Sequence, residues 1–235
     1  LYADALEQLE FLLNDSIKLR MKVDVPIGTF LSGGIDSGLI TGIASKYKNE
    51  QLRSFSINFT EKTYSELAEA EDTARRNGVN LTNFEIGTLT PDLLDEIFLS
   101  FDEPLGNASF VPTYILAKKA REKVKVVLTG DGGDELFGGY PTYQALYYQK
   151  LFSIIPNFLR NILRSGSKMI PVSHNRISFD FRIKQLMKGI HLTYQRAHYT
   201  WREVTPLNIQ NELFKNEIWQ NISSYDPFSV SESFF

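Results

Sequence analysis

Hydrophobic and polar residues along the chain follow two periods, one typical of amphipathic helices and one typical of buried strands. Apolar residues at helical spacing predict a first helix that ends near Lys22. After it, short apolar runs alternate with segments of helical period up to about Tyr140. Strands are predicted from residue 24 and over 52–59, 81–86 and 124–129, and helices after residue 34 and over 66–76, 89–101 and 112–123.

Strands that alternate with helices at this spacing favour an α/β domain with a mostly parallel sheet and helices on both faces. The pair Thr90-Pro91 predicts a helix start, and Asn77-Gly78 predicts a helix end. Beyond Tyr140 the strand pattern fades, and residues 156–170 and 182–190 have helical patterns. We therefore predict that the second part of the chain is a helical layer.

The composition is ordinary for a globular protein of 235 residues, with 43% hydrophobic and 23% charged residues. No apolar run reaches the roughly 20 residues of a membrane span, and none opens the chain as a signal peptide, so a cytoplasmic location without membrane partners is expected. The absence of cysteine excludes disulfides, thiolate zinc sites and a cysteine nucleophile. With only three histidines, metal chemistry would depend on carboxylates.

The net charge of −3 conceals a basic segment between residues 150 and 202. A solvated helical surface explains this excess of positive charge well. The functional alternative is that the segment attracts ATP or another anion electrostatically toward a binding site. Nucleic acid is a weaker alternative because no recognition motif accompanies the charge. The segment contains one acidic residue, Asp180, and ten basic residues: Lys150, Arg160, Arg164, Lys168, Arg176, Arg182, Lys184, Lys188, Arg196 and Arg202.

A first glycine-rich string, Ser-Gly-Gly-Ile-Asp-Ser at residues 32–37, follows an apolar strand and precedes a helix. Glycines allow close approach of a ligand, and the unpaired N–H groups of the loop and first helical turn favour a polyanion such as pyrophosphate. Ser32 and Ser37 add hydroxyl donors, and Asp36 beside a phosphate calls for a magnesium ion. The alternative is a plain strand-to-helix turn with Ser or Asp as the helix cap.

A second string, Gly-Asp-Gly-Gly-Asp-Glu-Leu-Phe-Gly-Gly-Tyr at residues 130–140, follows the last predicted strand. It gathers the carboxylates of Asp131, Asp134 and Glu135 within five residues, which is costly without a cation. Together with Asp36, they could supply oxygen ligands to magnesium pyrophosphate. An acidic surface turn is the alternative.

The two strings, with Asp102-Glu103-Pro104 between them, closely resemble the synthetase domain of glutamine-hydrolysing asparagine synthetases, members of the N-type ATP pyrophosphatase superfamily. The resemblance covers residues 6–143 and, more faintly, 184–214. It implies a parallel five-stranded-type sheet with helices on both faces, of the adenine nucleotide alpha hydrolase-like class, and then a helical layer. Residues 1–150 would form the nucleotide-binding core, and residues 151–235 the helical continuation of the same domain.

In that family ATP activates the side-chain carboxylate of aspartate as an acyl adenylate, pyrophosphate leaves, and ammonia displaces AMP. Asp131 stands where many members have Glu, a position tied to forming the adenylate. Tyr140 matches a tyrosine near the reacting centre, and an aromatic packed on the sheet edge is its alternative. The resemblance assigns nucleotide contacts to Leu31, Ser32, Gly33, Gly34, Asp36, Ser37, Ile57, Thr129 and Gly130, magnesium to Asp36 and Asp134, and catalysis to Asp131 and Tyr140.

The chain departs from the family at both ends. Full-length members begin with a glutaminase domain that has an N-terminal Cys nucleophile, and the resemblance implies such a domain in the full-length protein. This chain has no cysteine, so on its own it could use only free ammonia. The family's later basic-aromatic segment, with a phosphate-contacting lysine, is not found before Phe235, so the domain is expected to be C-terminally incomplete. The start at Leu1 rather than Met agrees with an excised piece.

Several functions remain open alongside ATP-dependent aspartate amidation. The same first loop serves NAD synthetase, GMP synthetase and transfer-RNA thiolation or lysidine enzymes, and some family members build β-lactams or amidate other carboxylates. A catalytically inactive nucleotide-binding relic is the non-enzyme alternative. The expected partners are the small molecules ATP, aspartate and ammonia, and a homodimer stays open.

Overall fold

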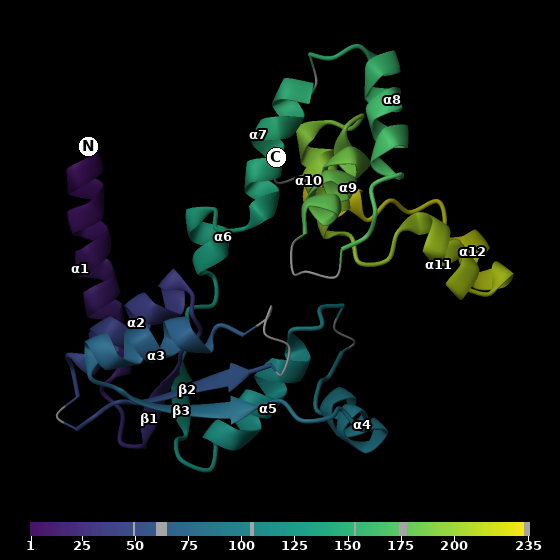
Figure 1. Cartoon of the computed structure of the whole chain (residues 1–235). Coiled ribbons are helices and arrows are strands. Elements are labelled where there is room, and N and C mark those ends of the chain that lie inside the picture. The colour runs from purple at the N-terminus through teal and green to yellow at the C-terminus, as the bar shows by residue number, and fades with distance from the viewer. Residues whose placement is uncertain (49, 60–64, 104–105, 153, 174–177, 233–235) are drawn as a thin grey trace. The chain divides into compact units, whose positions relative to one another are not determined.

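The computed structural model describes the chain except for residues 49, 60–64, 104–105, 153, 174–177 and 233–235 (Figure 1). The chain divides into two compact units, Leu1–Gly133 and Asp134–Phe235. The division falls inside the second glycine-rich string, so Gly130 to Gly133 belong to the first unit and Asp134 to Tyr140 to the second. The functional division at residue 150 stays a prediction.

Helices and strands alternate in the first unit, and the described residues of the second unit form helices without strands. The first unit contains α1 (Tyr2–Arg20), β1 (Ile27–Phe30), α2 (Ile35–Ser45), β2 (Arg53–Asn58), α3 (Leu67–Asn77), β3 (Asn80–Glu85), α4 (Pro91–Leu99), α5 (Phe110–Ala120) and β4 (Val126–Leu128). The second contains α6 (Gly133–Phe137, beginning at the last residue of the first unit), α7 (Pro141–Phe152), α8 (Asn157–Ser167), α9 (Phe179–Gly189), α10 (Tyr194–Arg202), α11 (Leu207–Leu213), α12 (Asn216–Ile222) and α13 (Phe228–Glu232).

The strands form one parallel sheet in the order β3-β2-β1-β4. This confirms the α/β class with a parallel sheet. The strand number differs from the expectation: the described residues contribute four strands to the sheet, where the family resemblance implied five. Each strand was placed correctly by its apolar run, but β4 (Val126–Leu128) is shorter than the predicted run 124–129 at both ends.

Each face of the sheet has its own hydrophobic core, as the alternation of side chains along a strand requires. On one face Leu31 packs with residues of α1, α2 and α3, including Ile17, Ile43 and Ala70. On the other face Phe55 packs with residues of α5 and of the segment that leads to β4. Figure 1 shows this arrangement, with α2 and α3 on one side of the strands and α5 on the other.

A chain of buried hydroxyl groups joins α2 to the sheet below the first glycine-rich loop. Thr41 of α2 donates a hydrogen bond to the Oγ1 of Thr29 on β1 (3.0 Å), and the Thr29 and Ser54 hydroxyls are 2.8 Å apart. All three side chains are fully buried. Because buried hydroxyls that find partners fix one geometry, these contacts set the position of α2 against β1 and β2.

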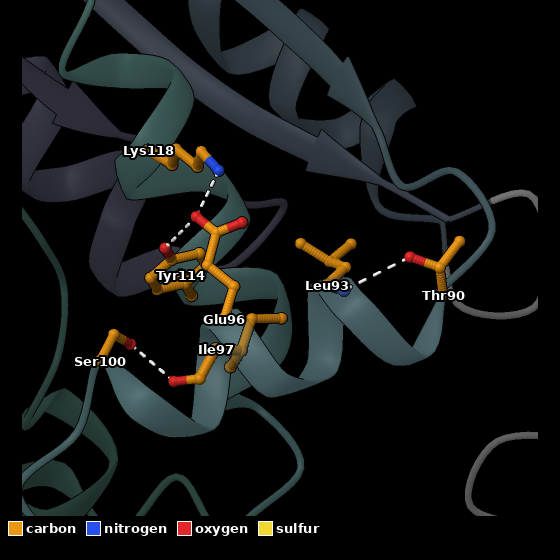
Figure 2. A network of polar contacts seen from close by, with 7 residues as sticks. All are labelled: Thr90, Leu93, Glu96, Ile97, Ser100, Tyr114 and Lys118. Atoms are coloured by element: carbon orange, nitrogen blue, oxygen red, sulfur yellow. Dashed lines mark hydrogen bonds and ion pairs between the residues drawn. The ribbon is translucent and has the colours of Figure 1, made fainter.

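Helix α4 is held by a polar network against α5, the helix that lies on the face of the sheet opposite α2 and α3 (Figure 2). The Tyr114 hydroxyl donates to Glu96 Oε1 at 2.7 Å, and Lys118 forms an ion pair with the same carboxylate. The hydrogen bonds from Lys118 and Tyr114 lower the pKa of Glu96. Thr90 caps α4 by accepting from the Leu93 N–H at 3.3 Å, which confirms the predicted start at Thr90-Pro91.

In the second unit, α9 packs against α7, α8 and α10, and α10 also packs against α7 and α13. Gln149 of α7 donates to the Leu192 carbonyl at 2.7 Å, which fixes the turn between α9 and α10. Arg160 donates to the carbonyl oxygens of Ile155 and Ile190 at 2.8 and 3.2 Å. Arg160, one of the basic residues of the segment 150–202, thus holds backbone segments of this unit together. Arg176 of the same basic segment lies outside the described residues.

In the described part of the chain, no helix is both long enough and apolar enough to cross a membrane.

Candidate functional site

The first glycine-rich loop connects the carboxyl end of β1 to the amino end of α2. The residue that caps α2 is Gly34, with φ −76° and ψ 157°, and no side chain caps this helix. The alternative that Ser or Asp supplies the cap is therefore wrong. The first N–H groups of a helix have no partner within the helix, so the start of α2 is a place that favours an anion, and the helix dipole adds to this preference.

The two serines of the loop bind to each other and to the loop backbone. The Ser37 hydroxyl accepts from the Ser32 N–H at 3.1 Å and lies 2.8 Å from the Ser32 hydroxyl, which itself accepts from the Gly34 N–H at 3.2 Å. Ser37 is buried and Ser32 is exposed. The Ser37 hydroxyl thus shapes the loop in this structure, and the Ser32 hydroxyl is the one that faces solvent.

Gly33 is required for space rather than for an unusual backbone angle. A Cβ atom at this position would lie 2.8 Å from the Cβ of Glu69 and 3.0 Å from the Cβ of Glu66, at the start of α3. A contact under 3.0 Å forces a neighbour to move, and atoms this close to the backbone move only with the helix itself. α3 therefore supports the loop from behind, a contact that sequence spacing did not reveal.

We expect Gly33→Val to weaken nucleotide binding more than Ser37→Ala does. Valine must displace either α3 or the loop, whereas Ser37→Ala removes one hydroxyl that binds within the loop and costs about 0.5–1.5 kcal/mol of stability. Calorimetric titration with ATP and chemical denaturation of both variants measure the two effects. The reverse order of ATP affinities would show that this loop does not enclose the phosphates.

The second loop meets the first because β4 pairs with β1 in the sheet. A Cβ on Gly130 would lie 2.6 Å from the Ser37 backbone nitrogen, and one on Gly133 would lie 2.4 Å from the Asp36 carboxyl carbon. The two glycines thus let the second loop lie directly against the first turn of α2. The structure brings together Ser32 to Ser37, Thr129 and Gly130 at one edge of the sheet, where ligands of parallel α/β folds bind.

Asp131 is exposed and is held by its neighbour Thr129. The Thr129 hydroxyl donates to Asp131 Oδ2 at 2.9 Å, and it also accepts a long bond from the Asp131 N–H at 3.4 Å. The hydroxyl assigned to the nucleotide and the carboxylate assigned to catalysis are therefore directly linked. Gly132, with φ +90°, provides the left-handed turn that follows.

Leu31 and Ile57 lie at the carboxyl ends of β1 and β2, as the assignment requires, but their side chains have different surroundings. The Leu31 side chain is 1% exposed and belongs to the core, so this residue can meet a nucleotide only through its backbone. Ile57 is half-buried and packs beside Phe55 on the opposite face. Its side chain remains a candidate for contact with a base.

Tyr140 makes its contacts within the second unit. Its hydroxyl donates to Glu135 Oε1 at 2.6 Å, and its ring lies 6.0 Å from that of Tyr143 and 4.3 Å from the guanidinium of Arg202. The bond to the Glu135 carboxylate raises the pKa of Tyr140, and the same bond lowers the pKa of Glu135. Sequence reasoning assigned no role to Arg202, which was visible only as one member of the basic segment.

Asp36 and Asp134 offer carboxylate oxygens of the kind that magnesium prefers. Both side chains are half-buried, and that of Asp36 lies against Gly133. Asp36 belongs to the first unit and Asp134 to the second, so their shared magnesium site stays a prediction. Within the described ranges, no three His, Asp or Glu side chains gather as a metal-binding group.

Of the Asp102-Glu103-Pro104 motif, Pro104 lies outside the described residues.

A parallel sheet with helices on both faces, and two glycine-rich loops that meet at its carboxyl edge, define an α/β protein with a candidate ligand site at that edge. The family model described as asparagine synthase matches residues 8–230. The chain therefore belongs to the asparagine synthase family, as the two motifs predicted.

Curated relatives from bacteria and archaea agree with this membership. The chain is 37% identical over 158 residues to asparagine synthetase [glutamine-hydrolyzing] 1 of Bacillus subtilis, covering 67% of this chain and 25% of the relative. It is 36% identical over 169 residues to a putative asparagine synthetase [glutamine-hydrolyzing] 2 of Methanocaldococcus jannaschii, covering 70% and 32%. The chain thus spans about a quarter to a third of the length of these relatives.

Solved structures show weaker likenesses. An NH3-dependent NAD synthetase from Campylobacter jejuni has a TM-score of 0.41 and 18% identity, covering 57% of this chain and 60% of the other. The U34-tRNA thiolase NcsA from Methanococcus maripaludis has a TM-score of 0.38 and 18% identity, covering 93% and 76%. At these scores the likenesses add nothing to the topology described above.

Proposed function

We propose that this chain carries the synthetase activity of an ATP-dependent amidating ligase. The observation that carries the proposal is the direct contact of the two glycine-rich loops, which places Asp36, Ser37, Gly130 and Gly133 around the amino end of α2. Membership of the asparagine synthase family supports ATP-dependent amidation as the reaction class. In this proposal the loops hold the pyrophosphate of ATP, and the acceptor is the side-chain carboxylate of aspartate.

The reaction would begin with attack of the aspartate carboxylate on the α-phosphorus of ATP. The bond from that phosphorus to the β-phosphate oxygen breaks, pyrophosphate leaves, and β-aspartyl-AMP forms. Ammonia then attacks the activated carbonyl carbon and forms the C–N bond, the acyl C–O bond to AMP breaks, and AMP leaves with its electron pair. The nitrogen releases one proton to solvent, which gives the neutral side-chain amide of asparagine. The N–H groups at the start of α2 would stabilise the negative charge that develops on pyrophosphate.

Magnesium, when bound, would neutralise the charge of the pyrophosphate group. Asp36 and Asp134 are the residues that would hold it, because their oxygen donors suit this ion. The Asp131 carboxylate, oriented by the Thr129 hydroxyl, would position the reacting groups during adenylate formation. Tyr140, held by Glu135, would orient the carboxylate substrate.

The ammonia source and the wider assembly are also proposals. The curated relatives named above are described as glutamine-hydrolyzing, and this chain has no cysteine to serve as a glutaminase nucleophile. We therefore expect glutamine hydrolysis in a separate N-terminal domain of the full-length protein. The homodimer remains an untested alternative.

Asp36→Asn tests the magnesium assignment. We expect this change to lower the affinity for magnesium-ATP while leaving the fold intact, because asparagine has nearly the same size as aspartate and the half-buried Asp36 side chain, in the first turn of α2, lies outside both hydrophobic cores. Calorimetric titration with ATP, with and without magnesium, measures the effect, and Asp95→Asn on the exposed side of α4 is the matched control. Equal magnesium dependence in wild type and Asp36→Asn would remove Asp36 from the metal site.

A further inference from the structure

A pocket in the second unit lies beside the residue that stacks on Tyr140. Its volume is about 320 Å³, at the small end of the roughly 300–1,000 Å³ typical of small-molecule sites. The pocket is formed by α10, the segment that follows it and one residue of α11. Its lining residues are Tyr199, Arg202, Glu203, Val204, Thr205 and Gln210.

The shape of this pocket is fixed by two contacts. Gln210 donates from Nε2 to the Thr205 carbonyl at 2.6 Å. This hydrogen bond holds the segment between α10 and α11 in place along one side of the pocket. The Arg202 guanidinium is held over the Tyr140 ring at 4.3 Å, an attraction between a cation and an aromatic face. The guanidinium also shares a hydrogen bond with the Tyr140 side chain, and its five N–H donors leave others for a ligand in the pocket.

The pocket carries one positive and one negative side chain, Arg202 and Glu203. Among the described residues, neither forms an ion pair within 4 Å. Burial, and then the nearby Glu203 carboxylate, raise the pKa of Tyr199, so its hydroxyl remains a neutral donor at pH 7. A pocket lined by one side chain of each charge suits a ligand that itself carries both charges, and the Glu203 carboxylate repels a polyphosphate.

We infer that this pocket binds a free α-amino acid, with the ligand's α-carboxylate at Arg202 and its ammonium group at Glu203. The inference rests on the proposed function only in the choice of aspartate as the first probe. It adds to that function a location for the amino acid next to Tyr140, the tyrosine that the family resemblance places near the reacting centre.

Calorimetric titration without ATP or magnesium tests the pocket, using L-aspartate and succinate as probes. Succinate has the same carbon chain and the same two carboxylates but lacks the ammonium group. We expect saturable binding of aspartate, weaker binding of succinate, and a loss of at least about 10-fold in affinity for both in Arg202→Met, because a charge-assisted hydrogen bond is lost. Glu203→Gln should weaken aspartate binding and leave succinate binding unchanged or tighter.

Two exposed positions of the same unit provide matched controls, Arg164→Met on α8 and Glu217→Gln on α12. Both should bind aspartate as the wild type does. If Arg202→Met loses its helical circular dichroism, the ratio of aspartate to succinate affinity in Glu203→Gln still decides the question. Absence of saturable aspartate binding in the wild type, or an unchanged ratio in Glu203→Gln, would overturn the inference.

The pocket and the proposed function fail in different ways. Aspartate binding that depends on Arg202 and Glu203, without any adenylate formation, would leave the pocket standing and reject the synthetase. Adenylate formation whose dependence on aspartate concentration is the same in wild type and Glu203→Gln would support the synthetase and reject the pocket.

Discussion

Gly130→Ala is expected to weaken ATP binding by about 5- to 150-fold. A Cβ at this position would lie 2.6 Å from the Ser37 nitrogen and 2.9 Å from the Asp36 carbonyl carbon, both backbone atoms that cannot rotate away. The second loop must then separate from the start of α2. Forcing an extra methyl group into a packed site typically costs about 1–3 kcal/mol, which corresponds to that range of affinities if the cost falls on binding.

The matched control for Gly130→Ala is Gly87→Ala. No atom lies within 4 Å of a Cβ at Gly87, and its backbone is outside the left-handed region, so alanine should be accepted without loss. Calorimetric titration with ATP gives the affinities, and thermal unfolding reports whether the variants fold. A folded Gly130→Ala protein with wild-type ATP affinity would show that the contact between the two loops does not form the nucleotide site.

Asp131→Ala should leave ATP binding nearly unchanged but reduce aspartate-dependent pyrophosphate exchange to background. The side chain is exposed and is linked to the site by the 2.9 Å bond from Thr129, so its removal disturbs neither core. This is the pattern of an interaction made mainly in the transition state. Asp131→Glu should retain activity, since it restores the residue seen in many family members.

Asp95→Ala, an exposed carboxylate on α4, is the control for charge alone and should retain full exchange. Isotope exchange between pyrophosphate and ATP, with and without aspartate, measures all three variants in the protein that contains this chain. Normal exchange in Asp131→Ala would reduce Asp131 to a loop carboxylate satisfied by the Thr129 hydroxyl.

Much of the first unit could be predicted from sequence because its signals are local. The apolar runs located all four strands of the described sheet, the Thr90-Pro91 pair located the start of α4, and Gly78 ends α3 in the left-handed conformation expected of a C-terminal glycine. The adjacency of the two glycine-rich loops follows from parallel strands, since their carboxyl ends lie at one edge of the sheet.

The remaining features depend on contacts between residues far apart in the chain. The reason for Gly33 lies in α3, more than thirty positions away, and no local pattern specifies that contact. The assignment of Ser37 to the phosphates stays a prediction, and the pattern did not foresee the bond between its hydroxyl and that of Ser32 in this structure. The stacking of Arg202 on Tyr140 required the packing of α10 against α7, which single-sequence periodicity does not give.

Pyrophosphate–ATP exchange by the unmodified protein tests the central claim most directly. Radiolabelled pyrophosphate is incubated with ATP and magnesium, in the presence and absence of L-aspartate, and label entering ATP is measured. Because exchange requires the adenylate to form and to revert, we predict label incorporation that depends on both aspartate and magnesium. ATP binding without exchange, or exchange at the same rate without aspartate, would contradict the assignment of this chain as an aspartate-activating synthetase.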